Sequence, residues 1–73
     1  YRVADLANAR RELQSLIDEE PSNPYYQELM GQILFENGRA EESIQYHERS
    51  LELRPNEPLF QINLARALTA ARG

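Results

Sequence analysis

The sequence predicts an all-α protein in which four helices form antiparallel hairpins that stack into a fragment of a solenoid. The first observation is an internal repeat of 34 residues, in which Pro21 and Pro24 recur as Pro55 and Pro58. The second is that apolar residues recur at spacings of three and four, as they do on one face of a helix. The third is that prolines and a glycine separate the helical segments. A period of this length is typical of stacked helical hairpins.

The first predicted helix follows Asp5, which we expect to be its N-cap. Its inward face is predicted from apolar spacings of three and four, which connect Leu6, Ala9, Leu13, Leu16 and Ile17. Pro21 and Pro24 end this helix and begin the next, because the residue before a proline is driven out of the α region.

The second predicted helix runs from Pro24 to about Asn37 and is capped by Asn23. Its predicted inward residues are Tyr26, Leu29, Met30, Ile33 and Leu34. Gly38 ends this helix, because glycine readily takes the left-handed conformation that satisfies the last carbonyls. The short polar connection that follows predicts that the third helix is antiparallel to the second.

The third predicted helix begins near Ala40, and Pro55 closes it. Glu41 and Glu42 lie in its first turn, where the positive end of a helix favours acidic side chains. One stripe of this helix carries Ile44, His47 and Leu51. The fourth helix is predicted from Pro58 towards the C-terminus, with an apolar face made of Phe60, Leu64, Ala67, Leu68 and Ala71.

Composition excludes several function classes. The 73 residues carry a net charge of −4, and the scattered basic residues are all arginines, so nucleic acid is not an expected partner. There is no apolar run of about 18 residues, so we expect no membrane insertion. With no cysteine and a single histidine, the chain has no ordinary structural zinc site. We expect neither a bound metal nor a cofactor.

The sequence also lacks a catalytic constellation. His47 and Glu48 begin the zinc-protease pattern in which two histidines four residues apart bind the metal, but Leu51 holds the second position. His47 is therefore interpreted as a half-buried packing residue. The adjacent carboxylates at 19–20 and 41–42 point about 100° apart on a helix and lie near helix ends, which favours solvated surface. We expect no catalytic residue and no enzyme activity in this segment.

From Pro24 to Pro55 the chain resembles one unit of the tetratricopeptide repeat (TPR) family. The slots of the family pattern hold Gln27, Met30-Gly31, Leu34, Ser43, His47 and Pro55, with small Gly31, Ser43 and Ser50 where helices cross closely. The resemblance implies that residues 1–23 end a preceding repeat, residues 24–57 form one complete repeat, and residues 58–73 form the first helix of a following repeat.

A narrower resemblance lies within residues 23–39. This run is similar to the C-terminal TPR region of bacterial periplasmic zinc metalloproteases of the BepA type. That resemblance implies a separate N-terminal protease domain, an export signal upstream, a periplasmic location and a role in outer-membrane protein quality control. It concerns only the non-catalytic part of such a protein.

TPR units imply a binding groove, because the first helices of successive units line a concave face. The candidate groove residues from the two first helices are Tyr25, Glu28, Leu29, Gln32, Phe35, Glu36, Leu59, Ile62, Asn63 and Arg66. This mixture of aromatic, amide and charged groups suits an extended peptide or a helix of a partner protein. An alternative interpretation is that Tyr25, Leu29 and Phe35 only pack against neighbouring helices.

TPR domains that hold a C-terminal carboxylate resemble one another in a lysine-asparagine pair on one first helix and an asparagine on the next. Only Asn63 matches this pattern, since Glu28 and Gln32 stand at the positions of the pair. A carboxylate clamp is therefore not expected.

Two classes of function remain open. The first is a scaffold segment that binds a protein or peptide on its concave face. The second is a structural spacer or self-association module, because Leu64 and Leu68 of the last helix would have no partner helix of their own.

Overall fold

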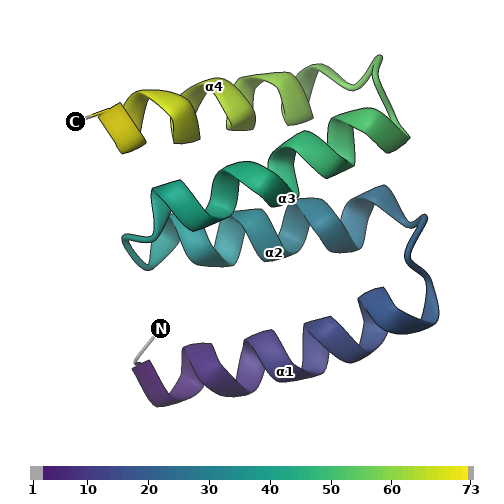
Figure 1. The fold of residues 1–73 in the computed structure, drawn as a ribbon, viewed down its shortest axis with the longest axis vertical. Helices are drawn as coiled ribbons and strands as arrows, with labels where there is room; N and C mark the ends of the chain where they lie inside the picture. The colour runs from purple at the N-terminus through teal and green to yellow at the C-terminus, as the bar shows by residue number, and fades with distance from the viewer. Residues whose placement is uncertain (1–2, 73) are drawn as a thin grey trace.

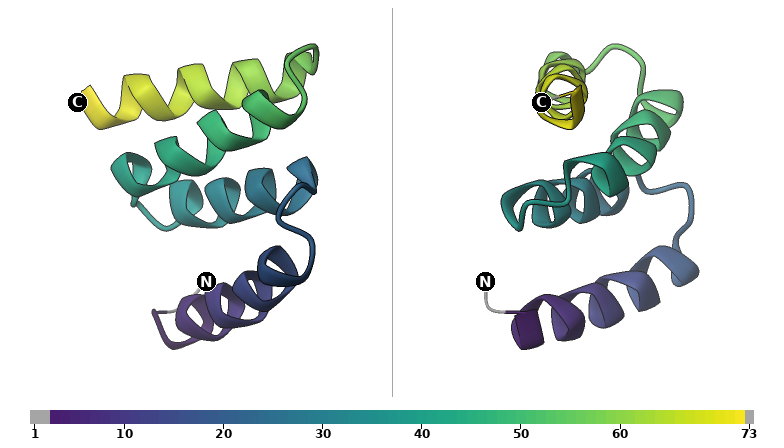
Figure 2. Two further views of the ribbon diagram at one scale, coloured as in Figure 1. Left: turned by 45° about the vertical axis from the view of Figure 1, so that its right-hand side comes forward. Right: turned by 60° about the vertical axis from the view of Figure 1, so that its left-hand side comes forward.

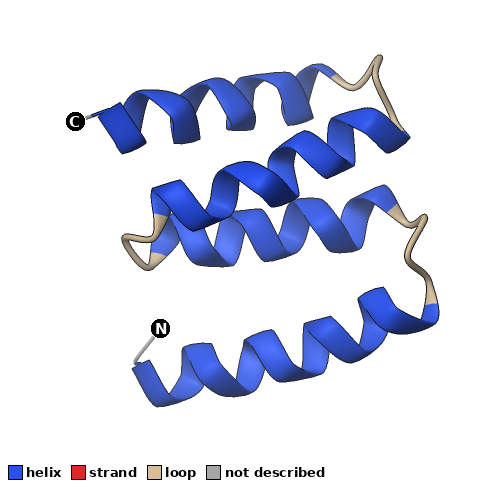
Figure 3. Cartoon of the chain, in the orientation of Figure 1, coloured by secondary structure: helices blue, strands red, loops and turns tan. Residues whose placement is uncertain are grey.

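The computed structural model describes residues 3–72, which form four helices joined by short turns: α1 (Val3–Glu19), α2 (Pro24–Glu36), α3 (Ala40–Leu53) and α4 (Pro58–Arg72) (Figure 1). All regular secondary structure in this range is helical (Figure 3). The predicted all-α class with four helices is therefore confirmed. Successive helices run in opposite directions (Figure 1). Residues 1, 2 and 73, which belong to the predicted terminal repeats, lie outside the described range.

The turn between α2 and α3 has the geometry that the sequence predicts. Gly38 has a φ of +76°, in the left-handed region. Its N–H donates to the carbonyl of Phe35 at 3.1 Å, and the N–H of Arg39 donates to the carbonyl of Leu34 at 2.9 Å. These two bonds form a Schellman motif, which satisfies the last carbonyls of the helix.

The beginning of α2 also follows the sequence rules. The side-chain oxygen of Asn23 accepts a hydrogen bond from the backbone N–H of Tyr25 at 3.0 Å, and Pro24 is the first helical residue. The prediction for α1 is wrong by contrast, because the helix begins at Val3 and Asp5 lies inside its first turn. Val3 does not break a helix, and a carboxylate inside the first turn still benefits from the positive helix end.

The helices pack as a series in chain order, in a body of 32 × 32 × 14 Å. The contact between α2 and α3 is the most extensive, followed by that between α3 and α4, while α1 has a smaller contact with α2. Figure 2 shows the same order from two further directions. None of the helices within residues 3–72 is both long and apolar enough to cross a membrane.

The apolar core lies between α1 and α2. Its buried members are Leu6, Leu13, Ile17, Met30, Ile33 and Leu34. Three leucines predicted to face inward are instead well exposed: Leu16 at 40%, Leu29 at 45% and Leu68 at 41%.

Each of these three leucines is next to a residue that is buried. Adjacent side chains on a helix point about 100° apart, so only one of such a pair reaches the contact with a neighbouring helix. Ile17, Met30 and Ala67 hold those positions. Ala71, in the last turn of α4, is exposed as well.

Gly31 lies where α2 and α3 approach closely. A β-carbon at this position would be 2.7 Å from Cε1 of His47, too close for an unstrained contact. On the facing helix, Ser43 and Ser50 are fully buried. The expectation that Gly31 occupies a tight crossing is therefore confirmed.

We expect Gly38→Ala to lower the free energy of unfolding by about 1 kcal/mol, because a β-carbon is disfavoured at positive φ. Gly31→Leu should cost more, about 1–3 kcal/mol or above, because the side chain overpacks against the ring of His47. Urea denaturation of both variants gives the comparison. A lower midpoint for Gly38→Ala than for Gly31→Leu would contradict the assignment of the tight crossing.

Candidate functional site

One buried carboxylate joins three of the helices. Glu28 of α2 is only 4% exposed. Its Oε1 accepts a hydrogen bond from Oγ of Ser50 at 2.7 Å, and its Oε2 accepts one from Nδ2 of Asn63 at 2.6 Å. Nδ1 of His47 lies 3.0 Å from Oε1. Since an ionised carboxylate only accepts hydrogen bonds, we place the shared proton on Nδ1.

Helix geometry explains how these donors come together. His47 and Ser50 are three residues apart on α3, so they share one face, and they are 1% and 0% exposed. Asn63 of α4 is 8% exposed and reaches Glu28 from the other side. No buried side-chain nitrogen or oxygen in the described part of the chain lacks a hydrogen-bond partner. The polar cluster of Glu28, His47, Ser50 and Asn63 therefore leaves no buried side-chain nitrogen or oxygen unpaired.

The environment of Glu28 favours its charged form. Burial alone raises the pKa of this carboxyl and is the largest single influence. The hydrogen bonds from His47, Ser50 and Asn63, together with the charge of His47, act in the opposite direction and outweigh it, so the pKa of Glu28 lies below its ordinary value of 4.5. Glu28 is therefore an ionised group held inside the protein at neutral pH.

A cavity of about 300 Å³ lies over this cluster, between α2 and α4. It is lined by Gln32, Phe35, Glu36, His47, Asn63 and Arg66. The guanidinium carbon of Arg66 is 5.3 Å from the centre of the Phe35 ring, which is a cation–π contact. A second, more open hollow adjoins it and shares Phe35 and Arg66, together with Ile62, Ala65, Thr69 and Ala70.

The structure brings most of the predicted groove residues to this region. Five of them line the first cavity, namely Gln32, Phe35, Glu36, Asn63 and Arg66, and Ile62 lines the second hollow. Tyr25, Leu29 and Leu59 are 52%, 45% and 54% exposed and line neither cavity. The prediction that Glu28 lies on the groove surface is wrong. It lies inside the protein and is hydrogen-bonded to His47 and Asn63, which line the cavity.

Tyr25 has contacts of its own. Its ring meets that of Phe60 edge to face, with 5.8 Å between the centroids. Arg54 donates a hydrogen bond to its hydroxyl at 2.8 Å, and the guanidinium lies 5.5 Å from the ring centre. Tyr25 therefore packs against α4 and the end of α3, yet half of its surface remains open to solvent.

Sequence reasoning misses the position of His47. It was expected to be half-buried by packing alone, but it forms part of the cavity floor and is hydrogen-bonded to Glu28. The available signal was that Glu28, His47 and Ser50 are polar residues on helix faces that turn towards one another. A buried acid requires donors, and these two residues were the candidates on the facing helix.

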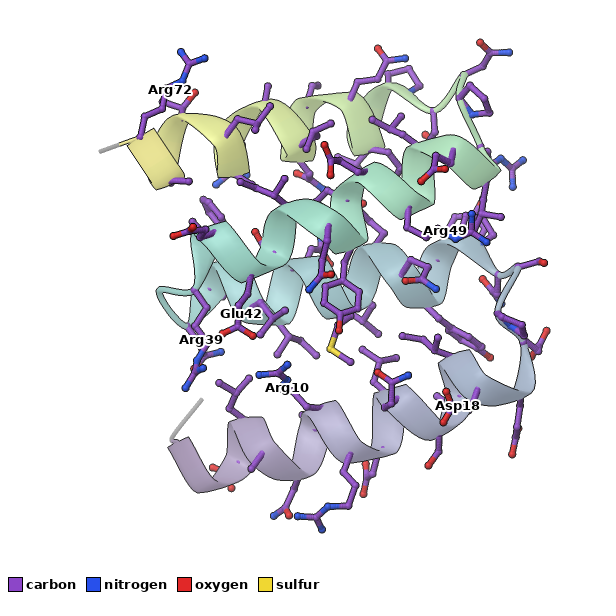
Figure 4. The ribbon with its side chains drawn as sticks, in the orientation of Figure 1. Arg10, Asp18, Arg39, Glu42, Arg49 and Arg72 are labelled. Atoms are coloured by element: carbon purple, nitrogen blue, oxygen red, sulfur yellow. The ribbon has the colours of Figure 1, made fainter. Side chains whose placement is uncertain are left out.

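A second set of charges lies away from the cavity. Glu42 is 3.0 Å from Arg39 and 3.3 Å from Arg10, so it links the beginning of α3 to α1 (Figure 4). The hydrogen bond from Arg39 lowers the pKa of Glu42, and the charge of Arg10 adds to this. Because these groups are well exposed, their contribution to stability is small.

No group of three or more histidine, aspartate or glutamate side chains in the described residues is arranged to hold a metal ion. A comparison of the chain with protein-family models, curated proteins and solved structures found no match. The function is therefore argued from the geometry of the groove and of the polar cluster beneath it.

We expect Glu28→Gln to lower the free energy of unfolding by about 1–3 kcal/mol. The new amide turns donors towards groups that themselves donate, and so leaves buried groups unpaired. Glu36→Gln is the matched control, since Glu36 is exposed on the same helix and its change should be within about 0.5 kcal/mol. Equal urea midpoints for the two variants would show that the cluster contributes nothing to stability.

Acid should remove the contribution of Glu28 to the free energy of unfolding. Its pKa in the folded protein is lower than in the unfolded chain, so the stabilisation is complete above about pH 4.5 and is lost as the pH falls through the folded pKa. The pKa of Glu42 is also lowered, so acid weakens the wild type through both groups. The quantity to measure is therefore the difference in unfolding free energy between the wild type and Glu28→Gln. This difference in unfolding free energy should be constant near neutrality and should shrink below pH 4.5. A difference that grows in acid would contradict the assignment.

Proposed function

We propose that this segment is a protein-interaction scaffold whose groove, formed by α2 and α4, binds an extended peptide or a helix of a partner protein. The observation that carries the proposal is the cavity of about 300 Å³ with its lining. Aromatic, amide and oppositely charged groups line it within one space, and its floor is fixed by buried hydrogen bonds. Ligand sites in proteins combine apolar walls with a few placed polar groups in this way.

In the proposed function, the residues that line the cavity make different kinds of contact with the ligand. Phe35 offers an apolar face, and the amides of Gln32 and Asn63 can pair with the backbone of a peptide. Nδ2 of Asn63 is held by Glu28, so its Oδ1 serves as the acceptor for a ligand. Glu36 and Arg66 carry opposite charges on α2 and α4, which would select the orientation of a bound peptide.

The floor supports affinity by being rigid before a ligand arrives. His47 and Asn63 form part of the cavity wall, and both are hydrogen-bonded to Glu28. A site that is already ordered in the free protein loses less conformational entropy on binding. Exposed apolar side chains beyond the cavity would extend the contact, namely Tyr25, Leu29, Leu59 and Ile62.

The resemblance to TPR units supports the same role, and we keep it as part of the proposal. On the narrower resemblance of residues 23–39, we also propose that the segment belongs to the non-catalytic part of a periplasmic zinc metalloprotease. An HExxH motif upstream in the same reading frame would support that origin, and its absence there would contradict it. The alternative function is a structural spacer or self-association module without a ligand in the groove.

The binding proposal predicts that this chain enriches specific sequences from a displayed library of random peptides. Phe35→Ala and Arg66→Ala should each weaken the binding of an enriched peptide by about tenfold, because each removes one wall of the cavity. Fluorescence anisotropy with a labelled synthetic peptide gives the dissociation constants.

Arg49→Ala is the control for the loss of an arginine. Arg49 is an exposed residue of α3 (Figure 4) and lines neither cavity, so its removal should leave binding unchanged. No enrichment over an unrelated helical protein, or enriched peptides that bind equally to Phe35→Ala, would overturn the groove proposal and favour the spacer.

A further inference from the structure

The last helix has an apolar face that α3 does not cover. Phe60 and Ala67 of α4 are 2% and 0% exposed and make its buried side. Leu68 is 41% exposed, Ala65 is exposed and Leu64 is half-buried. Figure 1 shows α4 as the outermost element of the series, with no other described helix on its far side. A face of this composition favours a partner helix.

The internal repeat indicates which kind of helix belongs there. With a shift of 34 residues, Leu64, Ala65 and Leu68 correspond to Met30, Gly31 and Leu34 of α2. In α2 these residues are buried, because α1 packs on one side and α3 on the other. In α4, only the side that faces α2 and α3 is covered. An element that covered the exposed side would therefore stand to α4 as α3 stands to α2.

The same shift relates α1 to α3. Ala9 and Leu16 of α1 correspond to Ser43 and Ser50 of α3, the small residues that are fully buried in the centre of the stack. In α1, Leu16 is 40% exposed, although its neighbour Ile17 is buried against α2. The exposed face of α1 thus corresponds to the face with which α3 covers α2.

The charges of the two end helices are complementary. Helix α4 carries Arg72 at its end and no acidic residue, while its other arginine, Arg66, belongs to the groove. Helix α1 carries two arginines and four acidic residues, which are Asp5, Glu12, Asp18 and Glu19. Opposite charge on two surfaces favours their association and selects their orientation.

The repeat also gives the register of such a contact. Arg72 corresponds to Gly38, and Asp5 corresponds to Arg39, so the two positions are adjacent in the turn that joins α2 to α3. Both side chains are exposed in the single chain. An antiparallel docking of α1 on α4 would bring this arginine and this aspartate together at one end of the contact.

We propose that α1 of a second copy of this chain docks on the exposed face of α4, antiparallel to it, in the place that α3 takes against α2. The contact joins different surfaces of the two copies, so each copy keeps a free α1 or a free α4 and further copies add end to end. Ala65 belongs both to this contact and to the second hollow of the groove. The residues of α4 that form the contact, Leu64, Ala65 and Leu68, do not line the first cavity of about 300 Å³.

Sedimentation velocity from micromolar to millimolar concentration tests the assembly. The wild type should form dimers and larger species as concentration rises, and Leu68→Glu should lower the association constant by about tenfold or more. Ala70→Glu is the matched control, since it places the same charge on the same helix at an exposed position that corresponds to Glu36, which stays exposed although α3 packs on α2. It should associate like the wild type, and circular dichroism should show that both variants remain folded.

Cysteine cross-linking tests the register, because the natural chain contains no cysteine. An oxidised mixture of the single variants Asp5→Cys and Arg72→Cys should yield a disulfide-linked dimer that contains one copy of each. The pair Arg49→Cys and Arg72→Cys, in which position 49 lies on α3, should give only background.

Three results would overturn the proposal. A wild type that stays monomeric up to millimolar concentration would show that α4 accepts no second copy. Association that is lost in Ala70→Glu but kept in Leu68→Glu would place the contact at the second hollow of the groove. Cross-linking of Arg72→Cys with itself, in preference to the mixed pair, would indicate a symmetric contact between two α4 helices.

Discussion

The position of α4 depends on the ionised carboxylate of Glu28, which receives hydrogen bonds from α3 and α4. A buried charge without partners costs several kcal/mol, so helix arrangements that move Asn63 or Ser50 away from it are strongly disfavoured. Apolar contacts tolerate small rotations, whereas hydrogen bonds of 2.6 and 2.7 Å do not. The carboxylate thus specifies how the three helices are rotated relative to one another, beyond any stability that it adds.

The contact between α1 and α2 and the contacts among α2, α3 and α4 depend on different interactions. Between α1 and α2 the contact is apolar and rests on leucine, isoleucine and methionine side chains. Between α2, α3 and α4 the centre is polar, and Gly31 gives the ring of His47 the space to reach Glu28. The small residue and the buried histidine therefore form one structural unit, since a β-carbon at position 31 would displace the donor that the carboxylate needs.

The buried polar residues fix part of the wall of the groove. His47 and Asn63 are members of the buried cluster and of the cavity wall at the same time. In the proposed function, the groups that a ligand would meet are therefore fixed by contacts made on folding, while Gln32, Phe35, Glu36 and Arg66 add the chemistry of recognition at the rim. In the proposed assembly, the α4 residues of the contact do not line the first cavity, although Ala65 also lines the adjoining hollow.

Apart from the beginning of α1, the helix boundaries followed from the sequence, as did the left-handed Gly38 and the tight crossing at Gly31. Proline, glycine and capping residues act through local backbone geometry. The placement of Gln32 and Phe35 in a groove was expected from the resemblance to TPR units. Only the tertiary structure decided that Glu28 is inside, and that Leu16, Leu29 and Leu68 remain exposed. Neighbouring positions on a helix point only 100° apart, and which of them is covered depends on how distant helices pack and pair their polar groups, information that no local pattern contains.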